Sequence, residues 1–141
     1  KIKFEEKILE KKKARNQQKI ASHLALANAR IEDALDDADI AITILSNDVQ
    51  VAIENNGEDA DLILFKADNL LEEILLRTQL RNQIAKNELI ANLQEDLDDT
   101  IETINIEESI SELKDKTATT ITTLEGKIAT EKEEFNQKYG E

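Results

Sequence analysis

Residues Leu62–Ile104 read LILFKADNLLEEILLRTQLRNQIAKNELIANLQEDLDDTIETI, and this stretch contains neither glycine nor proline. Its apolar residues recur at three- and four-residue steps, which is the spacing of one face of an α-helix. They form a narrow stripe of Ile90, Leu93, Leu97, Ile101 and Ile104, and a wider face of Leu70, Leu71, Ile74, Leu75 and Leu76. A helix that is apolar around so much of its circumference needs partners on more than one side. We therefore expect it to be the middle helix of a bundle.

The composition agrees with this expectation. The chain has 141 residues, which is the size of one domain, and it contains no Pro, Cys, Met or Trp and only three Phe and one Tyr. Its core must therefore consist of Leu, Ile, Val and Ala, and charged residues make up 35% of the chain. This combination with strong periodicity is typical of long helices and coiled coils. We predict an all-α fold, namely a long antiparallel helical hairpin plus a third helix in one domain, residues 1–141.

The first helix is predicted over residues 20–55, with residues 1–19 as a basic arm that precedes it. Its apolar positions are spaced close to a heptad repeat: Ile20, Leu24, Ala27, Ile31, Leu35, Ala38, Ile42, Leu45 and Val49. A β-hairpin is a rival interpretation of residues 40–53, because β-branched residues are dense there and Ser46-Asn47-Asp48 suits a turn. The sequence Asn55-Asn56-Gly57 predicts the end of this helix, because glycine readily adopts the positive φ of a helix C-cap.

The central helix is predicted over 58–104 and the third over 106–138. Asn105 with Glu108, and Ser109 with Glu112, resemble capping boxes that would start the third helix. Because no Gly or Pro separates the two helices, one continuous rod remains an alternative. The apolar face of the third helix is Ile110, Leu113, Thr117, Ile121, Leu124, Ile128 and Phe135.

Charge is distributed very unevenly. Residues 1–19 hold eight basic residues against three acids, a net +5, whereas the rest holds ten basic residues against 28 acids, a net −18, which together give the formal −13 of the chain. The basic residues of the arm are Lys1, Lys3, Lys7, Lys11, Lys12, Lys13, Arg15 and Lys19. If the chain folds back at Gly57, this arm lies opposite the acidic stretch Glu95–Leu113. We therefore predict that these eight side chains form an assembly site for an acidic partner, which would be the chain's own acidic helix, another copy or a related acidic helical chain.

No specific metal or catalytic site is predicted. Hard cations prefer carboxylate oxygens, so weak and diffuse Ca²⁺ binding is expected at Asp33, Asp36, Asp37, Asp39, Asp96, Asp98 and Asp99. The single histidine, His23, is interpreted as a half-exposed helix residue. With one His and no Cys, one chain cannot build a structural zinc site or a di-iron bundle. We expect no enzyme activity, because the sequence offers neither a nucleophile beside a base nor a glycine-rich phosphate loop.

We expect no nucleic-acid partner, because the whole chain is acidic and has only four aromatic residues for base stacking. The longest stretch without a formal charge is Ile20–Ala29, which is too short to span a membrane.

In composition the chain resembles the acidic, heptad-bearing matrix proteins of ciliate secretory granules, the trichocyst or granule-lattice type. The likeness rests on the acidic seams Ile31–Val49 and Ile90–Ile104, the Thr-rich segment Thr117–Thr123, and a beginning at Lys1 that suits a cleaved precursor. It implies a structural protein that assembles in a granule lumen and responds to Ca²⁺. Two other functions remain open from sequence: a soluble amphipathic bundle that carries lipid, and a secreted or surface binding module.

Overall fold

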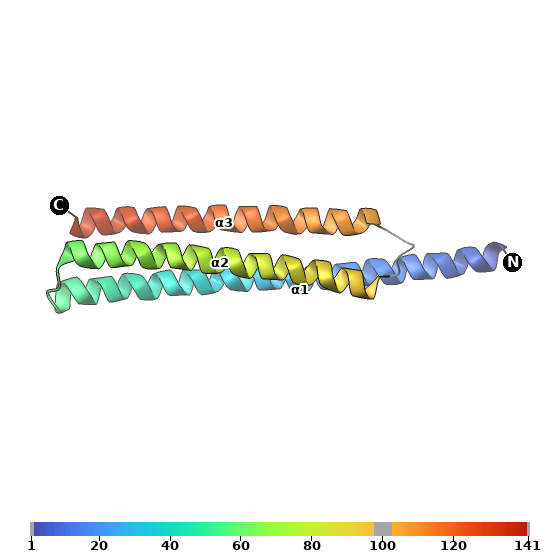
Figure 1. The fold of residues 1–141 in the computed structure, drawn as a ribbon, viewed down its shortest axis with the longest axis horizontal. Coiled ribbons are helices and arrows are strands. Elements are labelled where there is room, and N and C mark those ends of the chain that lie inside the picture. The colour runs from blue at the N-terminus through green and yellow to red at the C-terminus, as the bar shows by residue number, and fades with distance from the viewer. Residues whose placement is uncertain (1, 98–102, 141) are drawn as a thin grey trace.

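The protein is a bundle of three long helices in a computed structural model that describes residues 2–97 and 103–140 (Figure 1). Helix α1 spans Ile2–Gln50 and continues into a short π-helical turn, η1, at Val51–Asn55. Helix α2 spans Ala60–Asp96 and runs back along α1, and α3 spans Thr103–Tyr139 and runs parallel to α1. The predicted all-α fold is confirmed, and the described residues contain no strand.

The turn between α1 and α2 lies where the sequence predicted it. Gly57 has φ +64°, and the Asn56 N–H donates a hydrogen bond to the Val51 carbonyl at 3.0 Å. Asp59 caps α2, because its carboxylate accepts a hydrogen bond from the Asp61 N–H at 3.1 Å. Glycine and an acidic N-cap therefore fix the hairpin locally.

Residues 40–50 belong to α1, so the rival β-hairpin around Asn47 is wrong. The predicted apolar seam of this helix faces the core: Ile20, Ala27, Ile31, Ala38, Ile42, Leu45 and Val49 are buried, and Leu24 and Leu35 are partly buried. The β-branched residues are accommodated because tertiary packing of the seam outweighs their weaker helix propensity.

The core consists of two apolar clusters separated by a polar layer. The cluster near the hairpin includes Ala38, Ile42, Leu45, Val49, Ala67, Leu71, Ile74, Leu124, Ile128 and Phe135. The cluster at the other end includes Ile20, Ala27, Ile31, Ala85, Leu89, Leu93 and Leu113. Between them, Thr78, Asn82 and Thr120 are buried polar residues. Most of the predicted face of α3 is thus confirmed.

The boundary between the second and third helices differs from the prediction. Helix α2 ends at Asp96 instead of residue 104, and α3 has already begun at Thr103. Asn105 and Ser109 therefore lie inside α3, so neither capping box starts it. The alternative of one continuous rod is wrong as well, because α3 packs against both other helices. Ile101 lies outside the described residues.

Helix α2 contacts both neighbours, as expected of a middle helix, but it is apolar beyond the contacts it makes. Leu71, Ile74 and Leu93 are buried, and Leu75, Ile90 and Leu97 are partly buried. The side away from α1 and α3 exposes Leu62, Phe65, Leu70, Leu76, Leu80 and Ile84. We call this side the outer face of α2.

Candidate assembly surface

The N-terminal part of α1 extends beyond the ends of the other two helices (Figure 1). Every side chain from Lys3 to Arg15 is exposed, and Asn16 is the first buried residue. We call residues 2–15 the projecting arm. At a rise of 1.5 Å per residue it is about 20 Å long. It carries six of the predicted assembly residues, namely Lys3, Lys7, Lys11, Lys12, Lys13 and Arg15, while Lys1 lies outside the described residues.

The arm also exposes apolar side chains that the charge analysis overlooked. Phe4 is 69% exposed, Ile8 41% and Leu9 45%. Phe4, Ile8, Lys11 and Arg15 follow one another at steps of four, three and four residues, so they share one side of the helix. The sequence alone shows this spacing, so the apolar side of the arm could have been predicted. The arm is therefore amphipathic as well as basic.

Lys19 is not part of the projecting arm, although it was predicted to be an assembly residue. Its ammonium group donates a hydrogen bond to the Asp96 carbonyl at 3.1 Å. The imidazole Nε2 of His23 lies 2.7 Å from the Asp96 carboxylate, and this side chain is 21% exposed, as a half-exposed histidine should be. Lys19 therefore sits at the C-terminal end of α2, where the helix dipole favours positive charge.

The predicted pairing of the arm with Glu95–Leu113 does not hold for the part of that stretch that lies in α3. The register is right where Lys19 meets Asp96, but α2 ends at that point. The chain then returns as α3, in which Lys116 contacts Glu32 of α1 at 2.6 Å. Glu107, Glu108 and Glu112 consequently lie beside α1 well past the arm. The described part of that stretch from Glu107 onward therefore does not face the arm, and Asp98, Asp99 and Glu102 lie outside the described residues.

Ion pairs between helices join the body of the bundle. Arg81 lies 2.6 Å from Asp37, Lys127 2.7 Å from Asp39, and Lys132 2.8 Å from Glu72. Arg30 pairs with Glu88, and Lys138 lies 4.0 Å from Glu54. Exposed pairs of this kind contribute about 0–1 kcal/mol each, so they set alignment more than stability. Since residues 20–141 hold 28 acids against ten basic residues, the body has a large net negative charge despite these pairs.

The predicted Ca²⁺ residues do not form one cluster. Asp37 and Asp39 are already paired with Arg81 and Lys127, and Asp96 lies at the opposite end of α2 from the hairpin. Asp33 and Asp36 are exposed, and Asp98 and Asp99 lie outside the described residues. Within residues 2–97 and 103–140, no group of three or more His, Cys, Asp or Glu side chains is arranged to hold a metal ion.

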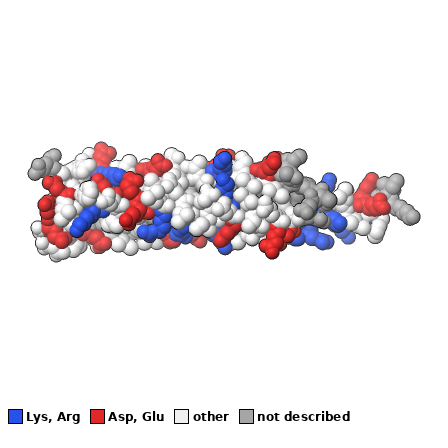
Figure 2. Space-filling model, in the orientation of Figure 1, with Lys and Arg blue, Asp and Glu red and all other residues white. Residues whose placement is uncertain are grey.

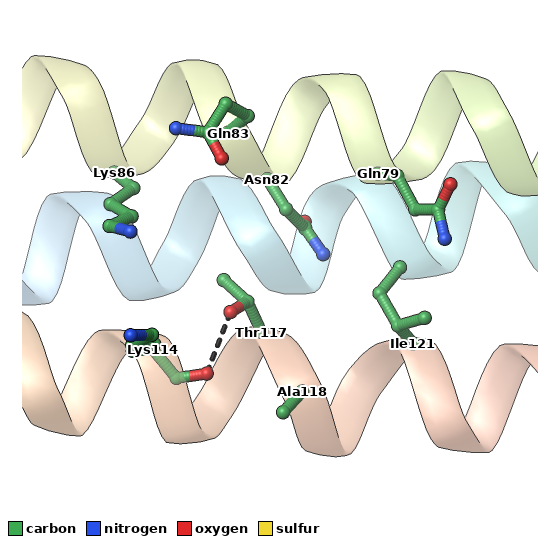
Figure 3. Close-up of a pocket in the computed structure, with 8 residues that line it drawn as sticks. All are labelled: Gln79, Asn82, Gln83, Lys86, Lys114, Thr117, Ala118 and Ile121. Atoms are coloured by element: carbon green, nitrogen blue, oxygen red, sulfur yellow. Dashed lines mark hydrogen bonds between the residues drawn. The ribbon is translucent and has the colours of Figure 1, made fainter.

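A groove of about 330 Å³ lies between α2 and α3 (Figure 3). Gln79, Asn82, Gln83 and Lys86 line it from α2, and Lys114, Thr117, Ala118 and Ile121 line it from α3. Within the groove, the Thr117 hydroxyl donates a hydrogen bond to the Lys114 carbonyl at 2.7 Å, and both residues belong to α3. Two lysines and three amides with no acid beside them do not form an acid–base pair.

Comparisons with protein-family models, with curated proteins and with solved structures found no match to this chain. Among the described residues, no helix is both long and apolar enough to cross a membrane.

Proposed function

We propose that this chain is a non-enzymatic structural protein that assembles, with copies of itself or with related acidic helical chains, through its projecting arm. The observation that carries the proposal is the arm itself: a basic, amphipathic helix exposed at one end of an acidic rod. The negatively charged bodies of two copies repel each other, whereas the positively charged arm of one copy is attracted to the body of another.

The energetics of a single helix support a role in binding. Isolated helices of this length are marginally stable in water, and most helical stability in proteins comes from packing of the apolar face. The arm exposes Phe4, Ile8 and Leu9 without a covering helix. A partner that covers these three side chains stabilises the arm and removes apolar surface from water at the same time.

The acidic body suggests the second part of the proposal, a response to Ca²⁺. A net charge of −18 over residues 20–141 opposes close packing of copies. Divalent cations that bind carboxylates weakly and diffusely lower this repulsion. Such a protein suits a secretory-granule matrix, the class that the composition resembles.

The test is sedimentation velocity of three full-length proteins at low and near-physiological ionic strength. The first is the unchanged chain, and the second carries Lys7→Glu and Lys11→Glu in the arm. The third carries Lys86→Glu and Lys114→Glu in the groove between α2 and α3, which changes the net charge equally. We expect concentration-dependent oligomers of the first and third proteins and a monomer of the second, with assembly weakened by salt. If all three sediment as monomers at every concentration and salt, the proposal is wrong.

A second function, lipid carriage, is favoured by the outer face of α2, where Leu76, Leu80 and Ile84 are 63%, 60% and 47% exposed. A bundle that opens around lipid would clear phospholipid vesicles as a monomer. Vesicle turbidity measured beside the sedimentation experiment separates the two functions: clearance by the monomeric arm variant supports lipid carriage.

A further inference from the structure

The outer face of α2 divides into two segments that differ in charge. From Ile74 to Asn87 the sequence contains three basic residues and no acid. From Glu58 to Glu73 it contains six acids, namely Glu58, Asp59, Asp61, Asp68, Glu72 and Glu73, and one base, Lys66. Figure 2 shows acidic side chains at the hairpin end of the rod, with some Lys and Arg side chains among them. A basic ligand is attracted to the second segment and repelled by the first.

The acidic segment also exposes large apolar side chains. Leu62 is 51% exposed and Phe65 is 65% exposed. Several other exposed apolar residues of the body have basic neighbours: Ile40 and Ile44 border a hollow with Arg77, Arg81 and Asp37, and Leu80 and Ile84 belong to the basic segment. Leu62 and Phe65, together with the less exposed Leu70, thus combine exposed apolar surface with the acids of the segment Glu58–Glu73.

The arm and this segment have complementary patterns. Asp61, Phe65, Asp68 and Glu72 are spaced by four, three and four residues along one side of α2. Phe4, Ile8, Lys11 and Arg15 have the same spacing along one side of the arm. Helical side chains at these spacings form one face. One face therefore presents acids around an aromatic ring, and the other presents cations next to apolar side chains.

The distribution of charge along each helix indicates their relative direction. The arm has Glu5 and Glu6 near its tip and most of its cations near its base, from Lys11 to Arg15. The α2 segment has Glu58, Asp59 and Asp61 beside the turn. At its other end Glu72 already pairs with Lys132 of α3 at 2.8 Å, and the cations Lys66 and Arg77 lie farther along than the turn. An antiparallel arrangement brings the arm's base to the acidic turn and its tip towards Arg77. Antiparallel packing is also the relation of α1 to α2 within one chain.

From this complementarity we propose that the projecting arm of one copy docks antiparallel on the segment Glu58–Glu73 of α2 in a second copy. The inference rests on the proposed function, assembly through the arm, and adds the surface that receives it. The arm and this acceptor segment lie at opposite ends of the rod (Figure 1). Such a contact joins two different surfaces, so each copy receives one arm and donates another. Head-to-tail contacts that do not close into a ring extend into open filaments.

A complementation experiment tests the inference with full-length proteins. The arm variant carries Phe4→Gln and Ile8→Gln, and the acceptor variant carries Leu62→Gln and Phe65→Gln. All four residues are exposed, and Gln is a good helix former, so each variant keeps the bundle, as circular dichroism will check. The matched control carries Leu80→Gln and Ile84→Gln on the basic segment of the same outer face.

We expect each of the two variants alone to associate roughly tenfold or more weakly than the unchanged chain, and the control to assemble normally. Mixed in equal amounts, the two variants should form a one-to-one dimer that grows no further, because one intact arm meets one intact acceptor. Sedimentation equilibrium of the mixture measures this directly.

Three results would overturn the inference. They are normal assembly of the acceptor variant, loss of assembly in the control to the same degree as in the acceptor variant, and a mixture that stays monomeric. If the acceptor variant assembles normally but the arm variant is monomeric, the proposed function still holds, because the arm then docks on another surface. An arm variant that assembles normally would remove both.

Discussion

At the scale of residues, stability in this bundle comes from a thin line of aliphatic side chains. Leu71, Leu89, Leu93 and Leu124 are almost completely buried, each on a helix whose opposite side is exposed. Because the chain has few aromatic residues, no single large side chain dominates the core. Burial of each leucine therefore contributes a sizeable share of the free energy of unfolding.

Two leucines of α2 allow a direct test of this view. Leu71 is 0% exposed and Leu76 is 63% exposed, although the two are close in sequence. Leu71→Ala should lower the free energy of unfolding by about 2–5 kcal/mol, because it leaves a cavity in the core. Leu76→Ala should change it by less than about 0.5 kcal/mol. Urea denaturation followed by circular dichroism measures both, and equal effects would mean that the outer face of α2 is not exposed in solution.

The polar layer between the two apolar clusters is the second feature at this scale. Asn82 donates to the Thr120 hydroxyl at 3.5 Å, and its side-chain oxygen is buried without a hydrogen-bond partner among the described residues. Thr78 satisfies its own hydroxyl by donating to the Ile74 carbonyl at 2.8 Å. An unpaired buried oxygen costs about 1–3 kcal/mol. Polar residues retained in helical cores can fix the register of the helices.

Asn82→Leu should therefore raise the free energy of unfolding by about 1 kcal/mol or more, because it replaces an unpaired oxygen with apolar contacts. The control is Gln83→Leu, on the exposed rim of the same groove, which should change stability by less than about 0.5 kcal/mol. Thermal unfolding of both variants gives the comparison. A loss of stability in the Asn82 variant would show that the oxygen has a partner in solution.

At the scale of elements, the sequence predicted what local chemistry decides and missed what tertiary contacts decide. The turn at Gly57 was predictable because neighbouring residues determine it: Gly57 adopts a positive φ and Asp59 caps the next helix. The end of α2 at Asp96 was not, because neither Gly nor Pro marks it. The arm's composition was equally visible from sequence, but its exposure depends on where α2 stops. The sequence shows that α2 is apolar on more than one side. Which of these sides faces solvent depends on where α3 packs, and the sequence does not show that.

The exposed arm should be the least stable part of α1. In the isolated chain, amide protons of residues 4–15 lack the packing that protects residues 31–45, where Ile31, Ala34, Ala38, Ile42 and Leu45 are buried. Hydrogen exchange of the monomeric Leu62→Gln/Phe65→Gln variant should show fast exchange in the arm and slow exchange in the bundle. In the assembled wild-type chain the arm should become protected as well. Equal protection of both segments in the monomer would contradict this account of the arm.

At the scale of the whole molecule, charge is distributed along a rod. Interhelical pairs such as Lys116–Glu32 and Lys127–Asp39 use several of the body's cations internally. What remains outside is a mainly acidic surface with one basic end and the basic segment Ile74–Asn87 on the outer face of α2. Assembly of such rods balances attraction at the ends against repulsion along the sides, so any agent that lowers the repulsion shifts the balance.

Calcium separates this balance from simple screening. Salt weakens attraction and repulsion alike over a Debye length of about 8 Å at 0.15 M. Ca²⁺ binds carboxylates, and 22 of the 28 acids in residues 20–141 lie outside the acceptor segment Glu58–Glu73, so it lowers repulsion between bodies more than attraction of the arm. Millimolar Ca²⁺ should therefore increase light scattering by the unchanged chain, and NaCl of equal ionic strength should decrease it. The Lys7→Glu/Lys11→Glu variant should respond much less to Ca²⁺, because its rods lack the end contact that repulsion opposes. If CaCl₂ and NaCl change the scattering of the unchanged chain equally, its carboxylates act only as a diffuse charge, and the proposed Ca²⁺ response is wrong. Assembly through the arm does not depend on this result, because the sedimentation experiment tests it separately.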